Sequence, residues 1–170
     1  MRFTYCPACG SLLTARPLGD EGPVPWCSGC DRPWFDMFST CVIAAAVNVR
    51  GEVALLREAR NPRREVLVAG YIKPGETAEE TVRREIAEEL GLRALDARLL
   101  RTAWHPKADQ LMIAFVARVE DAPFALSCET ESAAWAPLRE AVARVPEGSI
   151  AQRVVQAALD LTEVNGGWQR

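Results

Sequence analysis

The spacing of hydrophobic residues predicts a sheet of buried strands accompanied by a few helices. The apolar run Cys41–Val49 has the pattern of a buried strand, and a turn at Arg50 and Gly51 separates it from the next strand. Residues 60–64 are expected to form a polar loop. The predicted strands are residues 41–49, 52–57, 66–70, 95–104, 110–119 and 135–138, and the predicted helices are 78–90, 140–144 and 149–164. Strands clustered around two or three helices imply an α/β or α+β sandwich with a mixed sheet packed between helices.

The helix predicted over residues 78–90 has clear signals at both of its ends. Thr77 is a suitable N-cap, and Glu80, three residues later, completes a capping box. Gly91 falls where a left-handed residue commonly ends a helix. The inward-facing apolar stripe consists of Val82, Ile86 and Leu90.

Three carboxylates gather on one side of this predicted helix. Glu85, Glu88 and Glu89 occupy positions i, i+3 and i+4. Such charges repel one another unless cations neutralise them, and hard oxygen ligands favour Mg²⁺ or Mn²⁺. The alternative is a solvent-exposed helix face on which Arg84 forms ion pairs with glutamates. The turn at 73–76 can bring backbone groups close to a ligand, and together with the helix it favours the metal site.

The composition is that of an ordinary soluble globular protein. The 170 residues are 49% hydrophobic and 25% charged, which gives room for one main core and a small appendage. The net charge of −3 argues against bulk binding of nucleic acid but is compatible with a local basic cleft. Met1–Cys6 lacks the apolar region of a signal peptide, and the longest apolar run is too short to span a bilayer. We therefore expect a cytoplasmic location and no membrane partner.

The cysteines follow a metal-binding pattern near the N-terminus. Four of the six form two C-x-x-C pairs, Cys6 with Cys9 and Cys27 with Cys30. Two pairs at this separation suit a tetrahedral structural zinc site, without which so short a segment could scarcely hold a fold. The alternatives are a redox dithiol, which is typically a single C-x-x-C beside a βαβ pattern, or two disulfides. Cys41 and Cys128 flank apolar runs and are expected to be buried thiols.

The segment from Gly70 to Leu92 fits the pattern G-x5-E-x7-R-E-U-x-E-E-x-G-U, in which U is aliphatic. A chance match at a given start is on the order of one in a billion. The segment resembles the Nudix box of the Nudix hydrolases. The resemblance implies an α/β/α sandwich with a mixed sheet and a metal-dependent enzyme. Its expected reaction is cleavage by water of the pyrophosphate bond in a nucleoside diphosphate linked to another moiety.

Within that family the chain most resembles the NADH pyrophosphatase branch, in which an N-terminal Cys₄ zinc ribbon precedes this domain. The resemblance extends from Tyr5 to about Leu161 and implies a zinc ribbon at residues 1–36 and a Nudix hydrolase domain at 40–165. That branch has a Ser-Gln-Pro-Trp-Pro-Phe segment associated with NADH recognition. Here the corresponding stretch, Thr102–Lys107, reads Thr-Ala-Trp-His-Pro-Lys, which leaves the substrate open.

The resemblance also implies roles for individual residues. The expected ligands of Mg²⁺ or Mn²⁺ are Glu85, Glu88, Glu89, Glu129 and the carbonyl of Ala69. The expected catalytic residues are Glu88, Glu89 and Glu129, with Arg84 and Glu76 bracing the loop against the helix. Glu129 is alternatively a surface carboxylate, in which case Glu131 is the next candidate for the general base.

Several residues near the box are candidates for binding substrate. Arg57, Arg60, Arg63 and Lys73 lie close to it in sequence and are either phosphate clamps or solvated charges. Trp104 is suited either to stacking on a base or to packing at the sheet edge. His105, the one histidine of the chain, is more typical of a surface or stacking residue than of a catalytic base.

Three functional hypotheses remain open on the sequence alone. The first is hydrolysis of a small nucleotide substrate that is NAD(H)-like or ADP-ribose-like. The second is removal of a nucleotide cap from RNA. The third is a non-catalytic binding or regulatory module, which the intact box and the few basic residues of the ribbon disfavour. The ribbon is expected to support either the fold or a homodimer, as the resemblance suggests.

Overall fold

The computed structural model describes residues 3–164, and these fall into two compact units that divide between Ser39 and Thr40. In the first unit, β1 (Thr14–Pro17), β2 (Pro23–Cys27) and β3 (Arg32–Pro33) form an antiparallel sheet, with a short 3₁₀ turn, η1 (Gly19–Glu21), between β1 and β2. Its buried apolar residues are Cys6, Val24 and Cys27. So small a core makes the unit dependent on its cysteines.

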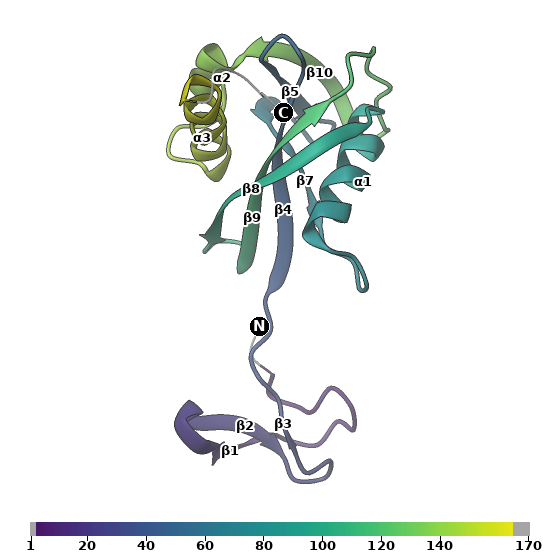
Figure 1. The fold of residues 1–170 in the computed structure, drawn as a ribbon. Coiled ribbons are helices and arrows are strands. Elements are labelled where there is room, and N and C mark those ends of the chain that lie inside the picture. Colours follow the sequence, from purple (N-terminus) through teal and green to yellow (C-terminus); the bar gives the residue numbers. More distant parts are fainter. Residues whose placement is uncertain (1–2, 165–170) are drawn as a thin grey trace. The chain divides into compact units, whose positions relative to one another are not determined.

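The second unit has a seven-stranded mixed sheet between helices, as the sequence predicts. Strands β10, β5, β4, β9 and β8 are neighbours in that order, β6 pairs with β5, and β7 pairs with β4. Figure 1 shows α1 on one face of the sheet and α2 with α3 on the other. The strands are β4 (Ser39–Val47), β5 (Glu52–Glu58), β6 (Asn61–Val66), β7 (Val68–Tyr71), β8 (Ala94–His105), β9 (Gln110–Val119) and β10 (Thr130–Pro137). The helices are α1 (Ala78–Leu90), α2 (Leu138–Arg144) and α3 (Ile150–Val164).

The two faces of the sheet have separate apolar cores. Strand β4 is buried on both sides, and its alternate residues divide between the cores. Ile43 and Val47 pack in the core of α2 and α3, whereas Val42 packs in the core of α1. The same alternation along the other strands decides which side chains can meet near α1.

The boundaries of α1 confirm the prediction from the sequence. The Thr77 hydroxyl accepts from the Glu80 amide at 3.2 Å, and the Glu80 carboxylate accepts from the Thr77 amide at 2.8 Å. Gly91 ends the helix with φ of 68°. Val82, Ile86 and Leu90 are fully buried, as expected.

Three predictions about local structure were wrong. Of the residues expected in a loop, 61–64 belong to β6, which pairs with β5 through Leu56 and Val66, and only Arg60 lies in the turn before that strand. The last strand begins at Thr130 rather than at residue 135, because its polar start pairs with the end of β5. Cys41 is buried, but Cys128 is exposed in the loop before β10.

Within residues 3–164, no helix combines the length and the apolar composition that crossing a membrane requires.

Candidate active site

Gly70 on β7 makes room for a buried carboxylate on α1. Glu85 is only 9% exposed, and its carboxyl group lies directly against the Gly70 backbone. A Cβ atom at Gly70 would lie 1.9 Å from Glu85 Oε1 and 2.0 Å from its Cδ. Only a glycine leaves space for this carboxyl group. Burial raises the pKa of Glu85, while the neighbouring Arg84 opposes that shift.

Arg84 joins four groups around this carboxylate. Its Nε and Nη2 donate to the two oxygens of Glu76 at 2.7 and 2.9 Å, which makes a bidentate pair. Its Nη1 donates to Glu85 Oε1 at 2.6 Å and to Glu88 Oε2 at 3.0 Å, and its Nη2 also donates to the Tyr71 carbonyl at 3.0 Å. These bonds tie the loop before α1, the helix and β7 together. The hydrogen bonds from Arg84 lower the pKa of Glu76 to about 2.

Glu89 lies in an environment that disfavours its charge. Burial raises its pKa to about 8, and the negative charges of Glu85, Glu58 and Glu129 add to the shift. The backbone amide of Ala69 acts in the opposite direction. A carboxylate among three others is ionised at neutral pH only when a cation compensates it.

The backbone of Ala69 faces this group of carboxylates. The Ile72 amide donates to the Thr40 carbonyl, so alternate residues of β7 direct their backbone groups toward β4. Ala69 and Tyr71 therefore direct theirs away from β4, and the bond from Arg84 to the Tyr71 carbonyl agrees with this. An amide and a carbonyl of one strand residue point to the same side. The Ala69 carbonyl consequently lies on the side of Glu89.

Glu58 is a member of the site that the sequence analysis did not identify. Ala54 and Leu56 of β5 pack in the core under α1, so Glu58, next in the alternation, lies on that face. Leu55 packs in the opposite core, so Arg57 lies on the opposite face. The period of two along β5 was the signal that could have found Glu58.

The structure corrects the expected position of Arg57. Its Nη2 pairs with Glu65 Oε1 at 3.2 Å, and Arg144 of α2 binds the same carboxylate. Arg63 lines the pocket around that pair. Both arginines are therefore separated by the sheet from the glutamates of α1.

Arg60 and Lys73, by contrast, lie beside the carboxylates. Arg60 forms a bidentate pair with Glu58 at 3.0 and 3.1 Å, and the charge of Glu129 raises its pKa further. Lys73 Nζ lies 3.9 Å from Glu88 Oε1. Both side chains are well exposed, so an anion in the solvent can reach them.

The remaining sequence candidates lie at the edges of the sheet. Trp104 lies on the edge strand β8, where it pairs with Leu111 of β9, and it is 46% exposed. The Nδ1 atom of His105 accepts from the Ala108 amide at 3.2 Å, which holds the imidazole to its own turn. Glu131 is exposed at the irregularity of β10 next to Thr130.

The donor set around α1 suits a hard divalent cation. It consists of carboxylates and one carbonyl, which are the oxygen ligands that Mg²⁺ and Mn²⁺ prefer. Arg84 already donates through Nη1 to two carboxylates of this set, those of Glu85 and Glu88. Arg60 pairs with Glu58 and Arg84 with Glu85, whereas no ion pair of the Glu89 carboxylate is found within residues 3–164.

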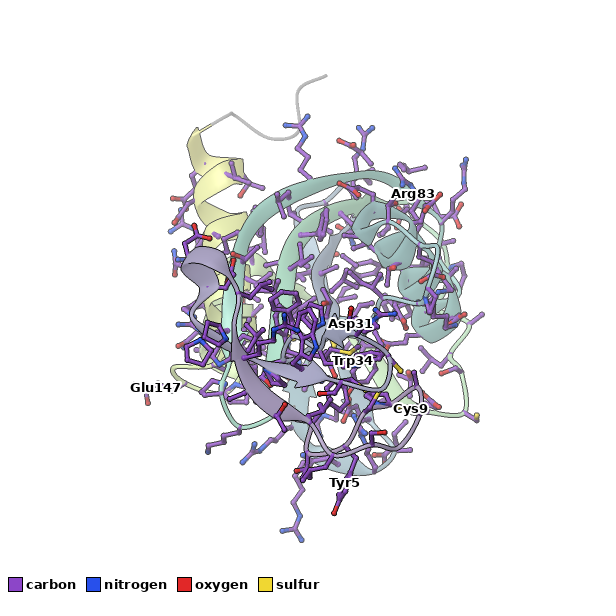
Figure 2. The ribbon with its side chains drawn as sticks, turned by 90° about the horizontal axis from the view of Figure 1, so that it is seen from below. Tyr5, Cys9, Asp31, Trp34, Arg83 and Glu147 are labelled. Atoms are coloured by element: carbon purple, nitrogen blue, oxygen red, sulfur yellow. The ribbon has the colours of Figure 1, made fainter. Side chains whose placement is uncertain are left out.

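The four cysteines of the first unit form a compact cluster. Their sulfur atoms all lie within 4.8 Å of one another, and Cys6 to Cys30 and Cys9 to Cys27 are 3.9 and 3.5 Å. A tetrahedral zinc site with Zn–S bonds of about 2.3 Å needs sulfur separations of about 3.8 Å. Figure 2 shows yellow sulfur atoms beside Cys9.

The thiols of this cluster cannot all ionise unaided. The Ser11 hydroxyl lowers the pKa of Cys9 to about 6, whereas Cys9 and Cys27 raise that of Cys30 to about 12. A bound cation would remove this conflict, because thiolates are its ligands. The cluster therefore fits zinc in both geometry and charge.

Comparisons with known proteins agree with this architecture. Residues 37–158 match the family model described as NUDIX domain. The NAD-capped RNA hydrolase NudC of Photobacterium profundum is 31% identical over 163 residues, which cover 93% of this chain and 59% of that protein. The protein of the same name from Klebsiella pneumoniae is 29% identical over 158 residues, covering 89% and 58%. The chain thus spans about three-fifths of the length of these relatives.

Solved structures share the fold. A NUDIX hydrolase from Nitrosomonas europaea superposes with a TM-score of 0.71 at 23% identity, covering 97% of this chain and 94% of the other. The NUDIX domain of Shewanella oneidensis NrtR, solved as a complex with ADP ribose, gives a TM-score of 0.63 at 18% identity, covering 75% and 90%. The expected sandwich with its mixed sheet is confirmed.

Replacing Gly70 by alanine tests the packing of Glu85. Alanine in a strand ordinarily gains about 0.5–1 kcal/mol over glycine. Here we expect Gly70→Ala to lower the free energy of unfolding by about 1–3 kcal/mol, because the new Cβ meets the Glu85 carboxyl group. Urea denaturation measures the change. In a Glu85→Ala background the same substitution should cost little, and an equal cost in both backgrounds would contradict the contact.

The raised pKa of Glu89 predicts a pH dependence of stability in the metal-free protein. Between its usual value of 4.5 and about 8, the folded chain holds a proton on Glu89 that the unfolded chain has lost. The free energy of unfolding therefore falls as pH rises through this window, by at most about 1.4 kcal/mol per pH unit. Glu89→Gln should remove this part of the slope, and Glu79→Gln, in the exposed first turn of α1, should not. Urea denaturation at several pH values would refute the assignment if both variants kept the wild-type slope.

Proposed function

The chain belongs to the NUDIX domain family, and on that premise we propose that it is a metal-dependent hydrolase of nucleotide pyrophosphate bonds. Its substrate would be a nucleoside diphosphate linked to another moiety, of the NAD(H) or ADP-ribose type. The observation that supports this most is the half-buried Glu89, whose neighbouring carboxylates create a negative charge that a divalent cation beside a phosphate would compensate.

The residues that would hold Mg²⁺ or Mn²⁺ are Glu85, Glu88, Glu89, Glu129 and the Ala69 carbonyl. When bound there, the cation would neutralise charge on phosphate oxygens and acidify water.

The protein's own residues would position and activate the reactants. Arg84 fixes the glutamates of α1 through its bonds to Glu85 and Glu88, and Glu76 fixes Arg84. These two residues would act by positioning. Glu89 and Glu129 are the candidates to accept a proton from the attacking water, because both carboxylates belong to the same electrostatic group.

The exposed cations beside the site would bind the phosphates of the substrate. Lys73 and Arg60 each already face a carboxylate of the site. A pyrophosphate is a stronger ligand for a guanidinium or an ammonium group than water is. Trp104, almost half exposed, is the candidate to stack on a ring of the substrate.

Capped RNA is the second candidate substrate. It is favoured by the relatives from Photobacterium profundum and Klebsiella pneumoniae, both of which are named NAD-capped RNA hydrolases. The same pyrophosphate chemistry would apply to an NAD-type 5′ end. A non-catalytic module is disfavoured by the intact segment from Gly70 to Leu92 and by the few basic residues of the first unit.

We further infer that the cysteine cluster holds one structural zinc ion. The charge conflict among its thiols and the small core of the first unit support this. Its part in stabilising a homodimer stays a prediction.

Product analysis by chromatography tests the proposed reaction. The purified protein is incubated with Mg²⁺ or Mn²⁺ and NADH, NAD⁺, ADP-ribose, nucleotide sugars, dinucleoside polyphosphates or NAD-capped RNA. We expect metal-dependent release of mononucleotide products. Glu89→Gln should lower the rate by about 100-fold or more, because it removes a ligand and a proton acceptor.

Glu79→Gln is the matched control for this assay and should keep the wild-type rate, since Glu79 lies in the exposed first turn of the same helix. Preference for ADP-ribose or NAD(H) would support the small-molecule substrate, and preference for capped RNA would support the second candidate. Absence of cleavage on the whole panel, with divalent metal still bound, would contradict the hydrolase.

Metal analysis tests the zinc site. Inductively coupled plasma mass spectrometry should find about one zinc per chain. Cys30→Ser should lose most of it, because it removes one of four converging sulfurs. Cys128→Ser replaces an exposed thiol outside the cluster and should keep the zinc. Equal zinc content in the two variants would refute the site.

A further inference from the structure

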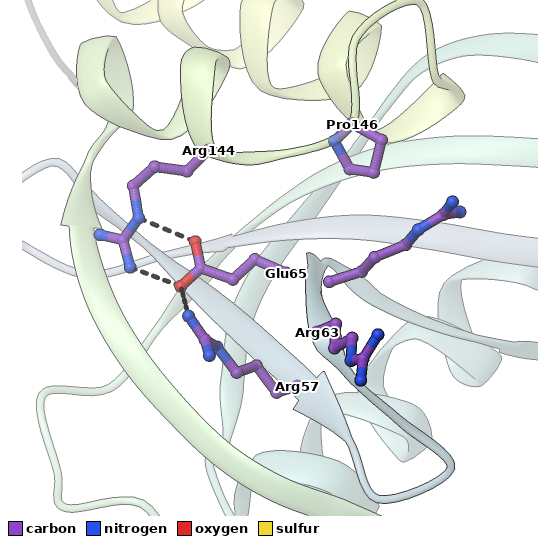
Figure 3. Close-up of a pocket in the computed structure, with 6 residues that line it drawn as sticks. Arg57, Arg63, Glu65, Arg144 and Pro146 are labelled. Atoms are coloured by element: carbon purple, nitrogen blue, oxygen red, sulfur yellow. Dashed lines mark hydrogen bonds and ion pairs between the residues drawn. The ribbon is translucent and has the colours of Figure 1, made fainter.

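A second cluster of charge lies on the face of the sheet opposite α1. There a cavity of about 570 Å³ is lined by Arg57, Arg63, Arg64, Glu65, Arg144 and Pro146. Arg57 lies on β5, and residues 63–65 lie on β6. Arg144 is the last residue of α2. Figure 3 shows Arg144 and Arg57 converging on Glu65, with Pro146 and Arg63 also lining the pocket. The function proposed above makes no use of this cavity.

Glu65 holds two of the arginines in place. Arg144 donates to it through Nε and Nη2, both at 2.8 Å, and Arg57 donates through Nη2 at 3.2 Å. The side chain of Glu65 is 13% exposed, and its bonds to Arg144 lower its pKa. The carboxylate therefore stays ionised and fixes both guanidinium groups. The Nη1 groups of both arginines take no part in these bonds.

The cavity has a large excess of positive charge. Four guanidinium groups face one carboxylate, which leaves three positive charges in excess in a chain of net charge −3. Arg63 and Arg64 are exposed, and no ion pair or hydrogen bond of their side chains is found within residues 3–164. Concentrating like charges in this way costs free energy unless an anion compensates them.

The lining also restricts what kind of anion would fit. Guanidinium groups bind phosphate oxygens through paired N–H donors. No aromatic or amide side chain lines the cavity, so it offers nothing to stack on or to recognise a base. We propose that this cavity is a phosphate-binding site, separate from the carboxylates of α1, which takes either a free polyphosphate or the phosphates of an RNA backbone.

Binding measurements on the full chain test this site without turnover. Mg²⁺ and Mn²⁺ are left out of the buffer, so that the result does not depend on hydrolysis. The probes are sodium tripolyphosphate, followed by calorimetry, and a 5′-fluorescein oligouridylate, followed by anisotropy. The variant is Arg63→Ala with Arg64→Ala. The matched control, Arg83→Ala with Arg101→Ala, removes two exposed charges elsewhere; Arg83 lies on α1 (Figure 2).

We expect the Arg63/Arg64 variant to bind at least one probe about tenfold more weakly or worse, since two charge-assisted contacts are lost. The slope of log affinity against log salt for the oligouridylate should fall by about 1.4, which is about 0.7 for each lost phosphate contact. The control variant should bind as the wild type does. Thermal melting followed by circular dichroism verifies that both variants are folded.

The two probes distinguish the sources of the phosphate. Weakening for both probes would identify a site for phosphate in any form, and weakening for the oligouridylate alone would identify the RNA backbone as its source. The proposal is overturned if neither probe binds, if the Arg63/Arg64 variant binds both as the wild type does, or if the control weakens equally. Equal weakening would mean that only the total charge matters.

Discussion

The arrangement of the candidate active site depends on one guanidinium group, that of Arg84. It gathers two carboxylates of its own helix, a carboxylate of the preceding loop and a backbone carbonyl of β7. Each of these groups would otherwise be free to move or would repel its neighbours. Because arginine stays charged at all ordinary pH values, the arrangement is held before any ligand arrives. The hydrogen bonds of Arg84 therefore hold α1, the loop before it and β7 together.

Arg84 does not compensate the charge of every carboxylate near α1. Arg84 satisfies Glu76, Glu85 and Glu88, whereas Glu89 meets Glu85, Glu58 and Glu129. The carboxylates bound to Arg84 thus have a structural role, whereas the negative charge of Glu89 requires a bound cation. The close contact between Glu85 and Gly70 contributes to the same arrangement, because it packs α1 against β7, the strand that contains Ala69.

Much of the fold and part of the site could be predicted from the sequence. The ends of α1 followed from short-range signals, Thr77 with Glu80 and then Gly91, which act within a few residues. The paired cysteines were equally local. By contrast, β6 is polar and exposed, so its strand character comes only from pairing with β5. The alternation along β5 could have placed Arg57 on the face opposite Glu58, but its place beside Arg144 needed the structure, because Glu65, which binds both arginines, lies 79 residues from Arg144 along the chain. Proximity in sequence to the box was a poor guide to proximity in space.

Strand β5 serves two surfaces of opposite charge with neighbouring residues. Arg57 points into the arginine-lined cavity, and Glu58 points toward the carboxylates of α1. Side chains of a strand alternate strictly, so inserting one residue between Leu56 and Arg57 would exchange the two faces. An arginine would then enter the acidic site and a glutamate the basic one. The length of this short segment therefore decides which charge reaches which surface, whereas exchanging one of its side chains for another leaves the two faces in place.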